Sequence, residues 1–343
     1  MSTPIIQNQI ITNKENNKMC TRMLYETGTG TFITGRGMDW SDPTAPFQIF
    51  SFPRGLERTG GPVENAVTWR SKYGSVTCSM YDASTTDGMN EQGLVANVLY
   101  LAEADFGETA QVDKPLISIG AWAQYFLDNF ATVAEAVAAM QNPPFVIVAP
   151  VLPNGRPPSV HLSLSDPSGD SAILEYIDGE LQIHHGSQYT VMTNSPIYDQ
   201  QLAINAYWEL IGGDRMLPGT INAADRYVRV SYFLNSSPKY KEPRMAVASV
   251  FSIMRSIGVP LGMEDPDHPN ISATLWRSVG DHAARRYYFE SALQPAVFWV
   301  DIAKLDLSEG ASPMSVKVDG PKELAGEISG ALEPAELFEW MWA

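Results

Sequence analysis

Cys20 is the residue of this chain that is best placed for covalent chemistry. It follows Met19 directly, and the first strand-like stretch, CTRMLY, begins with it. Once the preceding residues are removed, a thiol and a free α-amino group lie on one residue, with ordinary pKa values of about 8.5 and about 7.7–8.0. The amine can accept the thiol proton, so a nucleophile and its base are present without a histidine. The alternative, which residue type alone favours, is a buried structural cysteine.

A thiolate needs a neighbouring cation, and Arg36 is the candidate. Residues 20–25 and 31–40 are two strand-like runs around a Gly-containing turn, which predicts a β-hairpin. If the turn centres on Gly28, antiparallel pairing sets Cys20 opposite Arg36. A guanidinium at that place would stabilise the thiolate.

An N-terminal ammonium needs a neighbouring anion, and Asp39 is the candidate. Because Asp39 has the opposite strand parity to Arg36, both face Cys20 only if the strand bulges or ends. Gly35 and Gly37, on either side of the arginine, permit such an irregularity.

The sequence carries no motif for a metal or a nucleotide. The five histidines form no H-E-x-x-H, and the adjacent His184 and His185 point to opposite faces of a predicted strand. The glycines form no G-x-G-x-x-G. Two cysteines allow at most one disulfide and no C-x-x-C zinc site, and Cys78 is expected to be a core thiol. We therefore predict neither a metal nor a cofactor.

The composition is that of a folded, acidic protein. The 343 residues are 44% hydrophobic, and 23 Lys and Arg against 39 Asp and Glu give a formal net charge of −16. Such a body repels nucleic acid and anionic membrane. No window approaches the roughly 18 continuous apolar residues of a membrane span. We expect neither nucleic acid nor membrane as a partner.

Residues 1–19 are expected to be a leader or propeptide that is removed before activity, leaving residues 20–343 as a single catalytic domain. The isoleucines of this segment are interrupted by Gln and Asn, and Lys14 and Lys18 follow them, so the pattern of a secretory signal is missing. Removal could be autocatalytic. We favour translation from Met19 followed by an aminopeptidase. We expect the cytoplasm, or the periplasm if an export signal is missing from this sequence.

The periodicity predicts an α+β fold in one domain. Apart from the hairpin, strand-like patterns cover residues 75–80, 94–99, 145–151, 160–164, 172–176, 189–193, 273–279, 285–290, 297–301 and 314–318. Helical spacing covers residues 118–128, 200–211, 223–234 and 245–257, and a capping box at Thr132 and Glu135 begins a further helix. This order predicts helices that cover stacked sheets.

Taken together, the motifs resemble the choloylglycine hydrolase family, to which bile salt hydrolases and penicillin V acylases belong. They occur in the family order: Cys20-Thr-Arg, ITGRGMDW (33–40), DGMNEQGL (87–94), WAQYFLDNFATVAEAV (122–137), VMTNSP (191–196), LPGTINAADRYVR (217–229) and YYFES…FWVDIAKLDL (287–307). The resemblance implies the N-terminal-nucleophile (Ntn) hydrolase fold, a four-layer αββα sandwich of two stacked antiparallel sheets. It also implies hydrolysis of a non-peptide amide through an acyl-enzyme on the N-terminal cysteine, without cofactor or metal, and a homotetramer.

The resemblance assigns site residues one by one. Cys20 matches the nucleophile, Arg36 the arginine beside the thiol, and Asp39 the aspartate near the α-amine. Asn194 matches the asparagine of the oxyanion hole, where one neutral donor contributes about 2.7–4 kcal/mol. Arg226 matches the second active-site arginine. Residue type alone would make Asn194 an ordinary turn residue and Arg226 a solvated helix residue.

Two aromatic residues bear on the substrate. Family members that act on bile salts typically have asparagine at the position of Tyr100, whereas penicillin V acylases often have tyrosine. The backbone N–H of Tyr100 would serve the oxyanion hole and its ring would wall the acyl group, although the ring could also only pack in its strand. Trp40 could line the same pocket.

The sequence therefore predicts a penicillin V acylase-like cysteine amidohydrolase for phenoxyacetyl-like or fatty acyl amides. The alternatives are a conjugated bile salt hydrolase and an N-acyl homoserine lactone acylase. An alternative of another class is a non-catalytic acyl-ligand-binding protein on the same fold.

Overall fold

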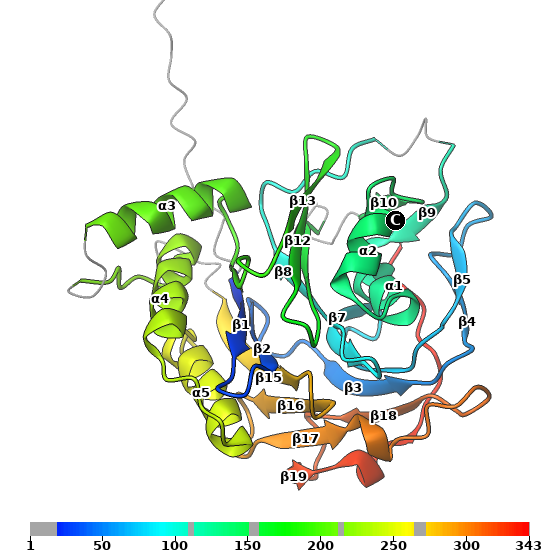
Figure 1. Cartoon of the computed structure of the whole chain (residues 1–343). Helices are drawn as coiled ribbons and strands as arrows, with labels where there is room; N and C mark the ends of the chain where they lie inside the picture. The colour runs from blue at the N-terminus through cyan, green and yellow to red at the C-terminus, as the bar shows by residue number, and fades with distance from the viewer. Residues whose placement is uncertain (1–18, 109–112, 151–157, 212–215, 264–271, 343) are drawn as a thin grey trace, which may run out of the picture.

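Two large β-sheets stacked face to face form the centre of the protein (Figure 1). The computed structural model describes residues 19–108, 113–150, 158–211, 216–263 and 272–342. The seven-stranded sheet has the order β14 (Val191–Met192), β1 (Cys20–Glu26), β2 (Phe32–Trp40), β15 (Ala273–Asp281), β16 (Arg286–Ser291), β17 (Phe298–Asp301) and β19 (Gly326–Glu327). Its neighbouring strands are antiparallel except for β17 and β19.

The second large sheet has nine strands, all paired antiparallel. Their order is β13 (Glu180–His185), β12 (Ser171–Ile177), β11 (Val160–Ser165), β8 (Val95–Tyr100), β7 (Ser84–Asn90), β6 (Ser75–Met80), β3 (Phe47–Phe52), β18 (Met314–Lys317) and β20 (Glu333–Pro334). Short pairs are formed by β4 (Glu57–Thr59) with β5 (Thr68–Arg70), and by β9 (Leu116–Ser118) with β10 (Val146–Val148).

Helices cover the outer face of each large sheet. On the seven-stranded sheet, α4 (Ala223–Ser236) and α5 (Pro243–Ser256) pack on β1, β2 and β15, and α3 (Tyr198–Leu210) packs on α4. On the nine-stranded sheet, α1 (Trp122–Asn129) and α2 (Val133–Met140) pack on β7, β8 and β12. This arrangement confirms the predicted four-layer αββα sandwich (Figure 1). Among the described helices, none is both long and apolar enough to cross a membrane.

Two apolar clusters hold these layers together. One fills the space between the sheets and under α5, and it includes Trp276 and Phe289 of the seven-stranded sheet and Cys78 of the other. Cys78 is fully buried, which confirms it as a core thiol. The second cluster joins the nine-stranded sheet to α1 and α2. Burial of this apolar surface is the main force that stacks the layers.

Local signals in the sequence place most of the helices correctly. Thr132 and Glu135 form the predicted reciprocal capping box at the start of α2. The helix expected over residues 118–128 begins only at Trp122, because residues 119–121 form a 3-10 turn capped by Ser118. Strands β3 and β7, which both lie inside the nine-stranded sheet, were not predicted from periodicity.

The hairpin of β1 and β2 is present, but the predicted register is wrong by two residues. Cys20 lies opposite Met38, and Arg36 lies opposite Arg22. The turn centres on Thr29 instead of Gly28, because the Thr27 N–H donates to the carbonyl of Thr31 at 2.8 Å. A shift of two residues preserves the face of a strand, so Cys20 and Arg36 still share the inner face.

Asp39 does not turn to that face. Together with Thr21 and Gly37 it lines a small recess beside Met254 of α5, so its side chain lies on the helix side of the sheet. The expected irregularity occurs in the partner strand: β15 bulges next to Thr274, which pairs with Asp39. The prediction that a bulge brings both Arg36 and Asp39 to the thiol side is therefore wrong.

Candidate active site

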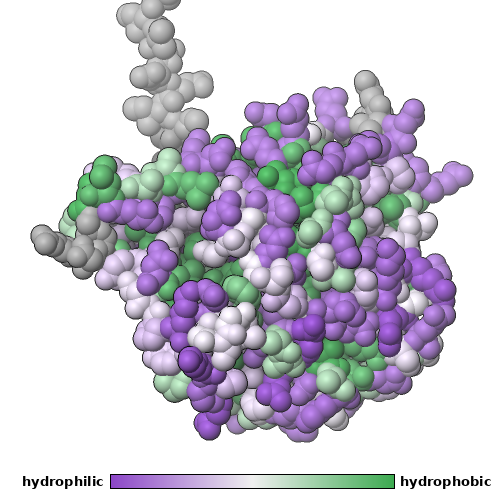
Figure 2. All heavy atoms as spheres, in the orientation of Figure 1, coloured by the Kyte–Doolittle hydropathy of each residue, from purple (hydrophilic) through white to green (hydrophobic). Residues whose placement is uncertain are grey.

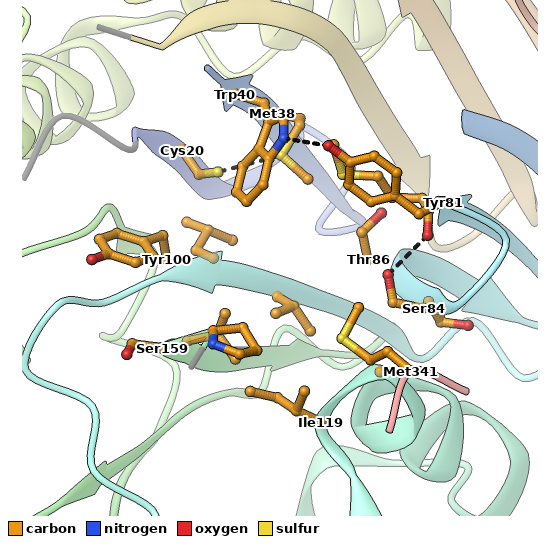
Figure 3. A pocket seen from close by; sticks show the side chains of 17 residues that line it. Cys20, Met38, Trp40, Tyr81, Ser84, Thr86, Tyr100, Ile119, Ser159 and Met341 are labelled. Carbon is orange, nitrogen blue, oxygen red and sulfur yellow. Dashed lines mark hydrogen bonds between the residues drawn. The ribbon is translucent and has the colours of Figure 1, made fainter. Parts of the chain in front are cut away.

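The thiol of Cys20 lies between the two sheets, at the first residue of β1. Its Sγ lies 3.7 Å from Sδ of Met38 and 3.9 Å from the carbonyl oxygen of Asp39. Cys20 lines a cavity of about 130 Å³, which Figure 3 shows from close by. A group bound in this cavity can contact the sulfur. With Met19 still attached, Cys20 is only 3% exposed.

Asn194 contacts the backbone nitrogen of Cys20. This nitrogen donates to Oδ1 of Asn194 at 2.6 Å. Nδ2 of Asn194 donates to the carbonyl of Tyr100 at 2.6 Å, so the amide links β1 to the end of β8. Because an amide NH2 carries two hydrogens, this bond uses one of the two N–H groups.

Arg226, from α4, contacts both Cys20 and Asn194. Its Nη1 donates to the carbonyl of Cys20 at 2.5 Å and to Oγ1 of Thr21, and its Nη2 donates to Oδ1 of Asn194 at 2.7 Å. Burial lowers the pKa of Arg226, and the charges of Asp39 and Cys20 oppose that shift. The guanidinium is fully buried, so the alternative of a solvated helix residue is wrong.

Gln201, in the first turns of α3, holds Asn194 in place. Its Nε2 donates to the carbonyl of Asn194, and to that of Pro196 at 2.9 Å. Its Oε1 accepts from Oγ1 of Thr193 at 2.7 Å. Asn194 is therefore part of a fixed, buried network rather than a solvated turn. Gln201 was not predicted, because a polar residue in the sequence gives no sign that it will be buried.

Arg36 lies on the inner face and pairs with the opposite sheet. Its Nη1 lies 3.3 Å from Oδ2 of Asp87 in β7, and its Nη2 donates to the carbonyl of Val98 at 3.1 Å. The guanidinium carbon lies 5.3 Å from the centre of the Trp276 ring. Burial acts to lower the pKa of Arg36, but Asp87 and then Cys20 raise it, and the net shift is upward. Arg36 therefore stays charged.

Asp39 belongs to the site through charge rather than through contact with the sulfur. Its Oδ1 accepts from Oγ1 of Thr274 at 2.5 Å on the helix side of the sheet. Burial raises the pKa of Asp39, and the charge of Arg226 opposes this shift most strongly. The negative charge of Asp39 therefore acts on the Arg226 guanidinium, which itself donates hydrogen bonds to Cys20 and Asn194.

Burial raises the pKa of the Cys20 thiol in this chain. Arg36 and Arg226 act in the opposite direction, and the charge of Asp39 adds to the rise. Desolvation dominates because Met19 and the sheets exclude water from the sulfur. The chain with Met19 attached therefore keeps the thiol protonated.

The cavity beside the thiol is lined mostly by hydrophobic side chains from both sheets. Its lining is Cys20, Met38, Trp40, Met80, Tyr81, Ser84, Thr85, Thr86, Val98, Leu99, Tyr100, Ile119, Gly120, Pro158, Ser159, Val160 and Met341. Tyr100 and Trp40 both line it, as expected from the sequence. Nε1 of Trp40 donates to the hydroxyl of Tyr81 at 3.0 Å, so two aromatic rings meet near the thiol (Figure 3). Tyr81 and Met341 were not anticipated as pocket residues.

This geometry is that of a thiol with an amide donor, two arginines and an apolar pocket, and the comparisons with known proteins place it in a family. The profile of the linear amide C–N hydrolases of the choloylglycine hydrolase family matches residues 20–319. The chain belongs to the choloylglycine hydrolase family. The predicted resemblance and the predicted enzyme class, a hydrolase of linear amide C–N bonds, are confirmed.

Individual relatives refine this placement. The chain is 47% identical to the penicillin V acylase of Pectobacterium atrosepticum, over 94% of this chain and 92% of that protein. It is 24% identical to the bile salt hydrolase/transferase of Clostridium perfringens, over 84% and 94% of the two chains.

Solved structures agree on the fold. The penicillin V acylase of Agrobacterium tumefaciens superposes with a TM-score of 0.87 at 50% identity, over 94% of this chain and 100% of that one. A mutant of the conjugated bile acid hydrolase from Clostridium perfringens superposes with a TM-score of 0.73 at 20% identity, over 89% and 98% of the two chains, which shows the shared fold alone. The Ntn-hydrolase fold is thereby confirmed.

Proposed function

We propose that this protein is a penicillin V acylase-like amidase whose nucleophile is the thiol of an N-terminal Cys20. The observation that carries the proposal is one arrangement: the sulfur lines the apolar cavity, while Asn194 and Arg226 hold the nitrogen and the carbonyl of the same residue. The sulfur, the amine and the oxyanion donor therefore lie around a single residue.

The reaction needs no group beyond these. The α-amine of Cys20 takes the thiol proton, and the thiolate attacks the carbonyl carbon of the amide. The second N–H of Asn194 Nδ2 and the backbone N–H of Tyr100 stabilise the oxyanion that forms. The intermediate collapses, the ammonium gives its proton to the leaving amine, and a thioester remains. Water, deprotonated by the same amine, then attacks the thioester and releases the carboxylic acid and the thiol.

The charged residues support this sequence of steps. Arg36 stays cationic on the thiol side of β2 and favours the thiolate. Arg226 fixes the carbonyl of Cys20 and the oxygen of Asn194, which leaves the nitrogen of Asn194 as the donor to the substrate. Asp39 supplies the negative charge that balances Arg226 and the ammonium.

Removal of residues 1–19 is part of the proposal. The amide nitrogen of Cys20 cannot act as a base while Met19 is attached, because its lone pair is delocalised into the peptide bond. We keep the route of translation from Met19 and removal of this methionine by an aminopeptidase, with autocatalytic cleavage as the alternative. The match of the family profile from residue 20 supports this boundary. Residues 1–18 lie outside the described residues.

The substrate class follows from the pocket and from the relatives. The lining is apolar and carries two aromatic side chains, Trp40 and Tyr100, so it suits a phenoxyacetyl or fatty acyl group. Relatives named penicillin V acylase are 47% and 50% identical, against 24% for a bile salt hydrolase/transferase. Conjugated bile salts and N-acyl homoserine lactones remain the alternatives.

A hydrolysis panel tests the proposal. Purified protein that begins at Cys20 is assayed with penicillin V, glyco- and tauro-conjugated bile salts, and N-acyl homoserine lactones of several lengths. Cys20→Ala and Cys20→Ser serve as controls. We expect penicillin V to be hydrolysed fastest, and both variants to lose almost all activity while they still bind the substrate. Wild-type protein that binds these compounds without hydrolysing them would instead support the non-catalytic alternative.

The proposed assembly is a homotetramer in the cytoplasm. The outer end of α3 exposes Tyr207 and Leu210, the latter 84% exposed, and Ile211 follows them. Hydrophobic side chains gather there on the surface (Figure 2). Exposed apolar patches of this kind mark contacts between proteins. Light scattering of the purified protein measures the oligomeric state, and cell fractionation measures the compartment.

A further inference from the structure

Met341 lies at the end of the cavity away from Cys20. Figure 3 shows the sulfur of Cys20 and the side chain of Met341 on opposite sides of the pocket, with Ile119 and Ser84 beside the methionine. Met341 comes from a segment more than 300 residues along the chain from Cys20. No motif of the family resemblance includes it, since those motifs end at Leu307.

Backbone hydrogen bonds fix Met341 on both sides. Its N–H donates to the carbonyl of Ala83, in the turn between β6 and β7, at 2.9 Å. Its carbonyl accepts from Oγ of Ser118, at the end of β9, at 2.5 Å. The methionine is therefore tied to two elements of the pocket wall.

The residues next to Met341 anchor the segment in the body of the protein. Trp340 is buried, packs edge-on against Phe338 with 5.0 Å between ring centres, and lies 5.6 Å from the guanidinium carbon of Arg58. The ring of Trp342 fills the space that a side chain at Gly61 would need. The contacts of Trp340 and Trp342 thus fix the position of Met341, and the side chain of Met341 lines the cavity.

We propose that Met341 forms the far wall of the acyl pocket and sets the longest acyl group that the enzyme accepts. The inference rests on the proposed function, since it assumes that the acyl group occupies this cavity while its carbonyl carbon meets Cys20. A methionine suits the role because its unbranched thioether adapts to irregular apolar shapes. Gly120 makes room for this side chain, because a Cβ at that position would lie only 3.1 Å from Cγ of Met341.

Two substitutions at this position should move the chain-length profile in opposite directions. Met341→Ala lengthens the pocket, and Met341→Phe shortens it, while the backbone hydrogen bonds remain. Each methylene of the acyl chain that becomes buried in the pocket, or is excluded from it, changes kcat/KM by about fourfold. Acyl groups too short to reach residue 341 serve as the internal reference for each variant.

The experiment uses amides of one common amine with straight-chain acids of increasing length. Protein that begins at Cys20 is assayed as wild type, Met341→Ala, Met341→Phe and the control Leu337→Ala, whose side chain is 41% exposed in the same segment. The readout is the ratio of kcat/KM for long and short acyl groups, which does not depend on the fraction of folded enzyme. We expect Met341→Ala to raise this ratio, Met341→Phe to lower it and Leu337→Ala to leave it unchanged.

Three results overturn the inference, and they differ in whether they also refute the proposed function. Wild-type profiles in both Met341 variants refute the role of Met341 and leave the proposed function standing. An equal shift in Leu337→Ala shows that the segment acts through general loosening. Wild-type protein that hydrolyses none of the amides, although Cys20 is N-terminal, refutes the proposed function as well.

Discussion

Asn194 connects Cys20 and Arg226 to Tyr100 at the pocket. Its oxygen accepts from Cys20 and from Arg226, and its nitrogen donates to the carbonyl of Tyr100. The orientation of the amide is therefore fixed before any substrate binds. A fixed donor needs no reorganisation when negative charge develops, which is why such donors are effective in catalysis.

Replacing this donor should slow the chemical step. We expect Asn194→Ala to lower kcat by about 100- to 1,000-fold with little change in KM, because the lost hydrogen bond forms mainly in the transition state. Steady-state kinetics on penicillin V measure both constants. Asn205→Ala, at a half-buried position farther along α3 where the amide donates to Glu209, is the matched control and should keep wild-type kinetics. A variant of Asn194 with unchanged kcat would remove this residue from the mechanism.

The thiol of Cys20 should change its acidity when Met19 is removed. Burial raises the thiol pKa in the chain that retains Met19. Removal of Met19 opens the sulfur to water and adds a positive ammonium group, and both changes lower the pKa. The rate of alkylation by iodoacetamide, followed by mass spectrometry across pH, measures it. We expect the chain that begins at Cys20 to react at lower pH than a chain whose Met19 cannot be removed. Coincident profiles would contradict the electrostatic account.

At the residue scale, the sequence predicted the groups that motifs carry and missed those that only the fold brings in. Cys20, Arg36, Asn194 and Arg226 all lie in recognisable motifs. Gln201 acts through contacts that the fold creates, and the sequence contains no local sign of them. Asp87 does lie in a motif, DGMNEQGL, but the motif does not show that this carboxylate pairs with Arg36.

At the element scale, Asp87 links the two large sheets. From β7 it pairs with Arg36 of β2, and it accepts from Oγ of Ser278 in β15 at 2.7 Å and from the hydroxyl of Tyr287 in β16 at 2.6 Å. One carboxylate therefore satisfies three groups of the opposite sheet in a buried place. A buried charge of this kind is stable only when its counter-ion and its hydrogen-bond partners are all present.

Breaking this set should destabilise the sandwich. We expect Asp87→Asn to lower the free energy of unfolding by about 3–5 kcal/mol, because it leaves the buried Arg36 without its counter-ion. Urea denaturation followed by circular dichroism measures the change. Glu26→Gln breaks an ion pair with Lys239 that lies in solvent, and should cost less than about 1 kcal/mol. Equal effects of the two substitutions would argue against Asp87 as the link.

Prediction of the elements was limited by turn geometry and by burial. The hairpin was expected, but its register depended on which residue centres the turn, and the Thr27–Thr31 hydrogen bonds move that centre to Thr29. Strand β7, with the sequence STTDGMN, was missed because it lacks apolar alternation. Every residue of β7 is buried, and its polar groups find partners in other elements.

At the scale of the whole molecule, stability should fall in acid partly through His282. Burial lowers the pKa of this histidine to about 4, while its two ring nitrogens contact the carbonyl of Gly93 and the hydroxyl of Thr34. The folded protein therefore keeps His282 neutral, whereas the unfolded chain binds a proton below about pH 6.5. The contribution, about 3 kcal/mol, is complete above pH 6.5 and is lost as the pH falls toward 4.

The substitution His282→Asn tests this contribution. It lowers stability at neutral pH, and it should also flatten the decline of unfolding free energy between pH 6.5 and pH 4. Urea denaturation at several pH values provides the slopes. Gln200→Asn, at an exposed position of α3 that carries no titratable group, is the control and should keep the wild-type slope. If His282→Asn kept that slope too, another group would be responsible for the acid sensitivity.

The architecture as a whole came from the resemblance more than from periodicity. Alternating strands and helices indicate stacked layers, but they do not give the order of strands. The central pairing joins β2 to β15, whose residues lie more than 230 positions apart in the chain. Such pairing depends on the whole fold. The order of elements predicted helices over stacked sheets, and the family resemblance added that there are two sheets and that both are antiparallel.

The most direct test of the central claim is the intact mass of the protein during turnover. Active protein is mixed with penicillin V, quenched in acid within the first turnovers, and analysed whole and after digestion. We predict a chain that begins at Cys20 and carries one added phenoxyacetyl group on the peptide that starts with this cysteine. Full activity in a chain that retains Met19, or an acyl group on any other residue, would contradict the account.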